Sequence, residues 1–66
     1  MRYEFIVPGP VPDEVVDELP EMSRACYPTG GTAIFGPVRD ESDVSSVLEH
    51  ILDAGLPVVE MRPLPD

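Results

Sequence analysis

The part of the sequence that most constrains the fold is residues 32–59, where apolar residues recur at helical spacing between two extended segments. They follow an i, i+3, i+4, i+7, i+8 pattern, which places them on one side of a helix. These residues are Val44, Val47, Leu48, Ile51 and Leu52. The opposite side carries residues that we expect to be exposed: Ser46, Glu49, His50 and Asp53. The sequence therefore predicts an amphipathic helix that covers a core.

Residues on both sides of this apolar stripe are typical of helix ends and of strands. Side chains that accept hydrogen bonds well precede it as candidate N-caps: Asp40, Ser42 and Asp43. Gly55 occupies the place of a left-handed C-cap, and Pro57 cannot continue the helix. Short strands are predicted before the helix at Thr32–Phe35, and after it at Val58–Arg62, where Pro63 ends the strand.

The beginning of the chain predicts one strand and one short helix. Arg2–Val7 alternates between two sets of side chains, one of them apolar, as in a half-buried strand. Pro12 opens a helix, because proline is tolerated in the first turn. Pro20 would cost about 3 kcal/mol inside a helix, so we expect this helix to end or kink near Leu19.

A hairpin is expected in the middle of the chain. Arg24–Tyr27 is a short strand, and a turn containing Gly30 and Gly31 joins it to Thr32–Phe35. Residues 1–66 then read strand, helix, strand, strand, helix, strand as a single domain. This is the order of the ferredoxin-like βαββαβ fold. In that α+β architecture two helices cover one face of a four-stranded antiparallel sheet, and the other face is open.

The chain is short for a stable core of its own. A chain of 66 residues buries only about 60% of its unfolded surface. One cysteine excludes an internal disulfide. Cys26 and His50 are the only soft metal ligands, whereas structural zinc needs four. We therefore expect neither metal nor cofactor, and we expect self-association to supply the missing stability.

The charge of the chain is strongly negative. Thirteen acidic residues and four arginines give a net charge of −9. Such acidity disfavours nucleic acid as a partner, because its phosphates would be repelled. No segment has the apolar length of a signal-peptide core or a membrane span. With the free thiol, this predicts a cytoplasmic protein that binds neither nucleic acid nor membrane.

The alternation along each strand predicts which side chains face the helices. The predicted helix-facing set is Tyr3, Phe5, Val7, Ala25, Tyr27, Ala33, Phe35, Val59 and Met61. The predicted open-face set is Arg2, Glu4, Ile6, Arg24, Cys26, Thr32, Ile34, Val58, Glu60 and Arg62. Three of the four arginines belong to the open-face set, whereas ten of the thirteen acids belong to the helices or their leading turns.

An apolar centre rimmed by charge is typical of a contact surface, so we expect the open face to join two copies or bind a protein partner. The residues predicted to form this interface are Arg2, Ile6, Arg24, Cys26, Ile34, Val58 and Arg62. The alternative is a solvated face on which the arginines pair with neighbouring glutamates.

The sequence offers no catalytic constellation, so we predict no catalytic residues and a non-enzymatic interaction module. Cys26 could act as a nucleophile with His50 as its base only if the two side chains lay within hydrogen-bond distance. The expected fold places them on opposite sides of the sheet. Arg39 precedes the N-terminus of the second helix, a natural anion site, and is the one candidate ligand-binding residue.

Two other functions remain open at this point. One is a small-ligand-binding regulatory domain like the ACT domains, which use this fold and bind metabolites at dimer interfaces. The other is a minimal enzyme or enzyme accessory protein with a pocket between sheet and helices. Such a pocket would favour the enzyme, whereas Arg39 at a dimer interface would favour the ligand sensor.

Turn and cap residues form a pattern in the second half of the chain. They are Thr32, Gly36-Pro37-Val38-Arg39-Asp40, Leu48, Gly55-Leu56-Pro57 and Arg62. This half resembles a group of short, uncharacterised bacterial proteins common in actinomycetes. Those proteins share Thr-x-x-x-Gly-Pro-Val-x-Asp, a leucine-rich helix, Gly-Leu-Pro and a strand ending in Arg. The resemblance implies no activity.

Overall fold

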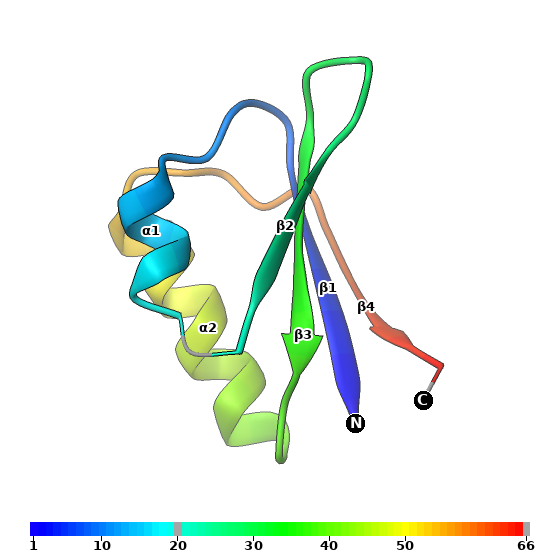
Figure 1. The fold of residues 1–66 in the computed structure, drawn as a ribbon. Coiled ribbons are helices and arrows are strands. Elements are labelled where there is room, and N and C mark those ends of the chain that lie inside the picture. Colours follow the sequence, from blue (N-terminus) through cyan, green and yellow to red (C-terminus); the bar gives the residue numbers. More distant parts are fainter. Residues whose placement is uncertain (20, 66) are drawn as a thin grey trace.

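The computed structural model describes residues 1–19 and 21–65, in which two helices lie against one four-stranded sheet. The elements are β1 (Arg2–Val7), α1 (Asp13–Asp17), β2 (Ser23–Cys26), β3 (Thr32–Pro37), α2 (Glu41–Asp53) and β4 (Glu60–Leu64). Both helices lie on the same side of the sheet, which Figure 1 shows nearly edge-on. The predicted α+β class, with a four-stranded antiparallel sheet and two helices, is confirmed.

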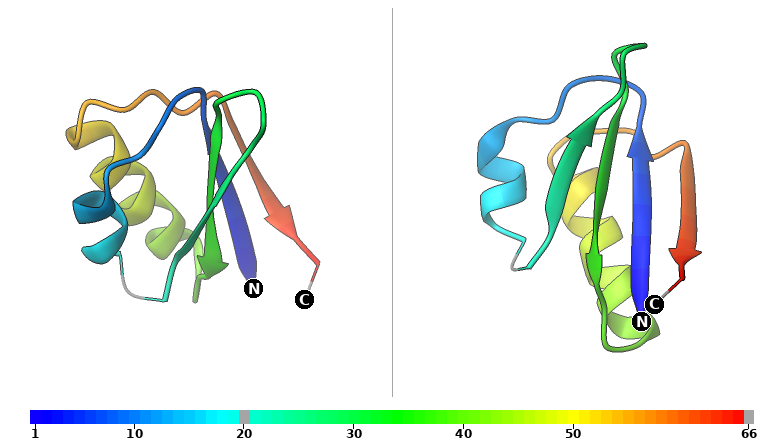
Figure 2. Two further views of the ribbon diagram at one scale, coloured as in Figure 1. Left: turned by 45° about the horizontal axis from the view of Figure 1, so that its top comes forward. Right: turned by 45° about the vertical axis from the view of Figure 1, so that its right-hand side comes forward.

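The sheet has the order β2-β3-β1-β4, and every neighbouring pair of strands is antiparallel. Figure 2 shows β1 and β3 side by side at the centre, with β2 and β4 at the two edges. A hairpin joins β2 and β3, and Gly30 in its turn has a φ of +96°. None of the helices in the described part of the chain is long and apolar enough to cross a membrane.

The core lies between the two inner strands and the helices. Its buried members are Phe5, Val7, Val11, Val15, Leu19, Ile34, Val38, Val44 and Ile51. Phe5 and Val7 are at most 1% exposed, so the helix-facing set predicted for β1 is confirmed. Each fully buried side chain of this size stabilises the fold by about 1.5–3 kcal/mol relative to its exposed state.

The prediction for the faces of β2 and β3 was wrong. Ile34 lies opposite Phe5 and is fully buried beneath the helices, although it was expected on the open face. Arg24 lies opposite Ile34, and Cys26 opposite Thr32, so both also change faces. Both faces of β3 are largely apolar, so alternation could not decide between them, and a shift of one residue exchanges all side chains.

The last strand also differs from its prediction. β4 begins at Glu60 rather than Val58, and it continues through Pro63, which lies opposite Tyr3. Proline is tolerated there because β4 is an edge strand whose outward N–H groups have no partner strand. Val58 lies before the strand and packs, half-buried, against the core.

The first helix is shorter than predicted. It ends at Asp17, although Val15 and Leu19 still enter the core. The helix therefore ends two residues before Leu19, where its end or kink was predicted, and Pro20 itself lies outside the described residues. Beyond it, Glu21 has a φ of +66°, a left-handed backbone that costs energy for any residue except glycine.

The second helix matches its predicted ends. The side chain of Asp40 accepts a hydrogen bond from the Asp43 N–H at 3.1 Å, which satisfies one of the free donors at the N-terminus. Gly55 follows the helix with a φ of +81°, as a left-handed C-cap requires. The buried side is rotated relative to the prediction, because Leu52 is 49% exposed whereas His50 is half-buried.

Candidate functional site

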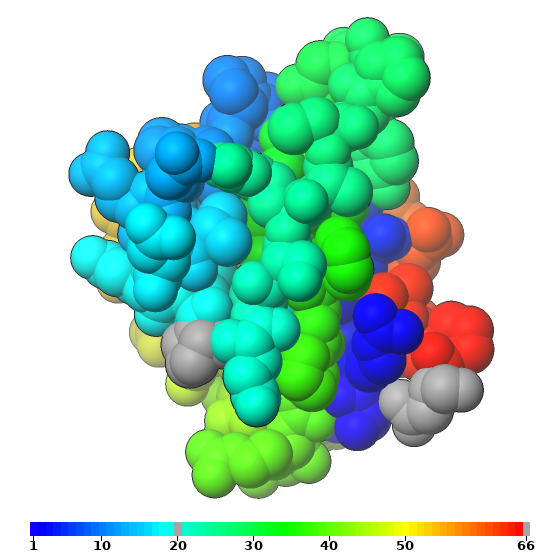
Figure 3. All heavy atoms as spheres, in the orientation of Figure 1, coloured from blue at the N-terminus to red at the C-terminus, as the bar shows by residue number. Residues whose placement is uncertain are grey.

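The side of the sheet away from the helices forms a first candidate site, the open sheet face. Its side chains, assigned from the strand register, are Ser23, Ala25, Ala33, Phe35, Pro37, Arg2, Glu4, Ile6, Glu60, Arg62 and Leu64. Ile6 and Phe35 are half-buried and form an apolar centre, in which Ala33 is only 2% exposed. Figure 3 shows the atoms of β2, β3, β1 and β4 following one another across the molecule.

A charged pair crosses this face beside the apolar centre. Arg62 Nε donates to Glu4 Oε1 at 2.8 Å, and Arg62 also lies 3.9 Å from Glu60. The hydrogen bond to Glu4 is the main reason that the pKa of Arg62 lies above its usual value. Glu4 is only 9% exposed, so the pair covers its carboxylate, while Arg62 keeps more than half of its side chain in solvent.

The structure divides the predicted interface residues into two groups. Arg2, Ile6 and Arg62 lie on the open sheet face as expected from their strands. Ile34, Arg24 and Cys26 belong to the helix side by register, and Val58 precedes β4. The open sheet face instead gains Ala25, Ala33 and Phe35, all of which the parity argument had placed under the helices.

Arg24 does not lie on the open sheet face but binds the segment that leads into α1. Its guanidinium donates to the carbonyl oxygen of Val11 at 2.5 Å and to the carboxylate of Asp13. The bond to Asp13 is the main cause that raises the pKa of Arg24 above its usual value. Arg24 therefore ties the edge strand β2 to the start of α1.

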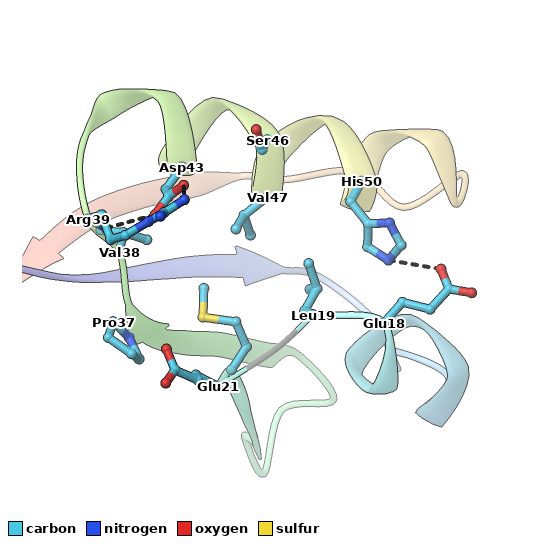
Figure 4. A pocket seen from close by; sticks show the side chains of 11 residues that line it. Glu18, Leu19, Glu21, Pro37, Val38, Arg39, Asp43, Ser46, Val47 and His50 are labelled. Atoms are coloured by element: carbon cyan, nitrogen blue, oxygen red, sulfur yellow. Dashed lines mark hydrogen bonds and ion pairs between the residues drawn. The ribbon is translucent and has the colours of Figure 1, made fainter.

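A second candidate site, the helix groove, lies between α2, the end of β3 and the segment after α1. It has a volume of about 600 Å³ and is lined by Glu18, Leu19, Glu21, Met22, Pro37, Val38, Arg39, Asp43, Ser46, Val47 and His50. Figure 4 shows one side-chain pair at each end, the ion pair of Arg39 with Asp43 and the contact of His50 with Glu18. Leu19 and Val47 lie between the two pairs.

At one end of the helix groove, Arg39 is engaged by Asp43. The Arg39 Nε donates to Asp43 Oδ2 at 3.0 Å, and the backbone N–H of Arg39 donates to the same oxygen at 2.9 Å. The side-chain bond is the main cause that lowers the pKa of Asp43. Asp40 caps α2 and Asp43 lies in its first turn. These two carboxylates already occupy the positive N-terminus of the helix, where an anion was expected.

At the other end, His50 connects the two helices, although it was expected to be exposed. Its Nε2 lies 3.2 Å from the carbonyl oxygen of Val15 and 3.5 Å from a carboxylate oxygen of Glu18. The sequence pattern of α2 describes only its apolar side. That pattern gives no information about α1, which packs beside α2 and covers His50.

Gly36 determines how the segment after α1 closes over the groove. A Cβ atom at Gly36 would lie 2.6 Å from the sulfur of Met22 and 2.7 Å from the carbonyl oxygen of Glu21. The segment can therefore lie directly on β3 only because position 36 is glycine. The strand was predicted to end at Phe35, but β3 continues through Gly36 to Pro37.

The helix groove lies between the sheet and the helices, where a pocket was expected to favour an enzyme. Of the pair considered for catalysis, His50 belongs to its lining and Cys26 does not. Within residues 1–19 and 21–65, no three His, Cys, Asp or Glu side chains are grouped to hold a metal ion. Cys26 is an exposed free cysteine in β2, whereas His50 faces α1.

Comparison with known proteins gives one match. Residues 2–62 match a family model described as "Domain of unknown function (DUF8691)". No curated protein and no solved structure matches the chain.

Proposed function

We propose that this chain, which belongs to the DUF8691 family, is a non-enzymatic interaction module that pairs with a second copy through the open sheet face. The observation that carries the proposal is the pair of half-buried apolar side chains, Ile6 and Phe35, at the centre of a face that neither helix covers. Water at such a centre is released when a second apolar surface covers it.

The charges around this centre suit a second copy of the same chain. Arg2 and Arg62 lie on the face together with Glu4 and Glu60, so the face carries equal numbers of positive and negative side chains. In a two-fold arrangement each patch meets its own copy, so an arginine of one chain can lie opposite a carboxylate of the other. A strongly basic or acidic partner would gain nothing from such a balanced rim.

The acidity of the helices supports the same orientation. Ten acids occupy the helices or the segments beside them: Asp13, Glu14, Asp17, Glu18, Glu21, Asp40, Glu41, Asp43, Glu49 and Asp53. When two sheets face each other, these acidic layers point away from one another. Their repulsion is then weakened by distance and by salt, whose screening length is about 8 Å under physiological conditions.

Pairing would add to the stability of a domain whose own core is small. A stable interface takes about 800 Å² from each partner, which is about one fifth of the 4211 Å² that one chain exposes. Burial of this kind offsets the limited core of a chain of 66 residues.

We also infer that the topology is ferredoxin-like. The order β2-β3-β1-β4, with antiparallel neighbours throughout, supports this assignment. In this arrangement β1 lies between β3 and β4, and β3 lies between β1 and β2. Each β–helix–β unit is thereby split by an inserted strand.

A bacterial, actinomycete-type origin and a cytoplasmic location complete the proposal. The turn pattern from Thr32 to Arg62 supports the origin, and the exposed thiol of Cys26 supports a reducing compartment. A search for this pattern among DUF8691 members would test the origin, and fractionation of the source cell would test the location.

Analytical ultracentrifugation of the wild-type protein and two variants tests the pairing. Phe35→Asp places a charge at the centre of the open sheet face, whereas Leu52→Asp places the same charge on an exposed position of α2. We expect wild type and Leu52→Asp to sediment at twice the 7.2 kDa of one chain, at both low and high salt. We expect Phe35→Asp to be a folded monomer.

A folded wild-type monomer at about 100 μM would overturn the proposal. So would a Phe35→Asp variant that remains as dimeric as wild type. Circular dichroism of each variant separates loss of pairing from loss of folding.

A further inference from the structure

We propose that the helix groove is a binding site for an elongated organic dication, an aliphatic diamine whose two ammonium groups lie at the two ends of the groove. This site is separate from the open sheet face, because its lining comes from α2, the end of β3 and the segment after α1. Its volume of about 600 Å³ is in the range of about 300–1,000 Å³ that is usual for small-molecule pockets.

The middle of the groove suits the hydrocarbon part of such a ligand. Leu19, Val38 and Val47 belong to the core or pack against it, and each presents an apolar surface to the groove. Met22 adds a flexible thioether that adapts to chains of different shape. A methylene chain lying there would leave water without giving up any hydrogen bond.

The ends of the groove suit positive charge. Glu18 lies at one end beside His50, and the carboxylate of Glu21 lies toward Pro37 at the other end (Figure 4). Asp43 adds a third carboxylate, and it already binds the one guanidinium in the lining, that of Arg39. The lining therefore carries an excess of negative charge, in a chain whose net charge is −9.

The spacing of the ends sets the length of the ligand. Asp43 and His50 are seven residues apart in α2, which corresponds to about 10 Å along the helix axis. With C–C bonds of about 1.5 Å, a chain of about eight methylenes spans a similar distance.

The backbone at one acidic end of the groove has an unusual conformation. Glu21 has a left-handed φ of +66°, and the absence of a side chain at Gly36 lets the Glu21–Met22 backbone lie on β3. Strained backbone of this kind is concentrated at binding and catalytic sites. The strain at Glu21 is thus explained if its carboxylate has to be presented at the rim of the groove.

Titration calorimetry with 1,8-diaminooctane, in about 150 mM salt, tests the proposal. The comparison ligands share the same chain: octylamine removes one positive charge, 1,8-octanediol removes both, and 8-aminooctanoate replaces one with a negative charge. We expect one diamine to bind per chain. An exposed ion pair contributes up to about a factor of five, so we expect octylamine to bind roughly fivefold more weakly and the diol roughly 25-fold more weakly. We expect 8-aminooctanoate to bind more weakly than octylamine, because its carboxylate is repelled by the acids of the groove.

Three variants that change the net charge equally identify the site. Glu18→Gln and Glu21→Gln each remove one carboxylate from the groove, whereas Glu49→Gln removes one from outside it. We expect the first two each to weaken diamine binding roughly fivefold and Glu49→Gln to change it less than twofold. In the amide NMR spectrum, the diamine should shift the signals of Leu19, Met22, Val38 and Val47.

Several outcomes would overturn the proposal. If the diol binds as tightly as the diamine, the groove recognises only the apolar chain. If 8-aminooctanoate binds as tightly as the diamine, Arg39 binds the carboxylate of the ligand. An equal loss in Glu49→Gln would show that the diamine follows only the net charge. A basic helical peptide that binds more tightly, with the same NMR shifts, would make the groove a protein docking site.

Discussion

Individual side chains connect parts of the chain that are far apart in the sequence. Arg62 bonds Glu4, 58 positions away, and His50 contacts the Val15 carbonyl, 35 positions away. Such partners have no local spacing that a sequence pattern could reveal. This is why Arg62 and His50 were assigned to faces from strand and helix periodicity alone, correctly for Arg62 and wrongly for His50.

Ile34 provides the most direct test of the corrected strand register. Replacing this fully buried side chain by alanine should lower the free energy of unfolding by about 2–5 kcal/mol, because it leaves a cavity against Phe5. Val59→Ala, at a position that is 63% exposed, should change it by less than about 0.5 kcal/mol. Urea denaturation of both variants makes the comparison, and equal effects would contradict the register.

The ion pair of Arg39 and Asp43 predicts a dependence of stability on pH. Because the hydrogen bond to Arg39 lowers the pKa of Asp43 in the folded protein, the pair contributes stability above the unfolded pKa of about 3.9. That contribution is lost as the pH falls through the lower folded pKa. Arg39→Gln should therefore be less stable than wild type at neutral pH, and the difference should vanish in strong acid.

Thermal unfolding between about pH 2 and pH 7 measures this difference. The matched control is Arg39→Gln in an Asp43→Asn background, where the change of Arg39 should have little effect at any pH. A difference between wild type and Arg39→Gln that grows in acid would contradict the assignment.

The two helices differ in how far their own sequence defines them. α2 has thirteen residues, a side-chain N-cap at Asp40 and a left-handed C-cap at Gly55, so its limits depend on local interactions. α1 has five residues and no side-chain cap, so Val15 and Leu19 must hold it by packing into the core. Helices this short are not stable alone in water.

Gly36 tests the contact between β3 and the segment after α1. Gly36→Ala should lower the free energy of unfolding by about 1–3 kcal/mol, because the new Cβ meets backbone at Glu21 as well as the Met22 side chain. Gly9→Ala is the matched control, since a Cβ there meets nothing within 4 Å. If both variants unfold at the same urea concentration, the segment does not lie on β3 as described.

The distribution of charge gives the molecule two unlike sides. The helical side carries most of the thirteen acids, and the open sheet face carries a balanced set of charges around Ile6 and Phe35. Pairing of two open faces would therefore combine the least charged surfaces of two strongly acidic molecules.

If the folded chain pairs in this way, its melting temperature should depend on concentration. Because pairing stabilises only the folded state, a hundredfold rise in protein concentration should raise the Tm of wild type by several degrees. The Tm of Phe35→Asp should not change over the same range of concentrations, because a monomer does not gain stability from pairing. Differential scanning calorimetry at several concentrations measures both, and a constant Tm for wild type would count against pairing.

The sequence alone determined the features that depend on neighbouring residues. The limits of α2, the order of the elements and the inward side of β1 follow from periodicity and capping, and all three agree with the structure. Phe5 and Val7 were assigned correctly because the other side of β1 carries Arg2 and Glu4, so only one side is continuously apolar.

Only the tertiary structure decided the features that depend on pairing between distant segments. In β3, Ala33 and Phe35 are as apolar as Ile34, so the side that faces the helices depends on which residue lies opposite Phe5. The position of His50 depends on α1, and the helix groove depends on the approach of Glu21 to Gly36. These contacts form only when the chain closes into its sheet, because local periodicity specifies a side of one element but not its partner.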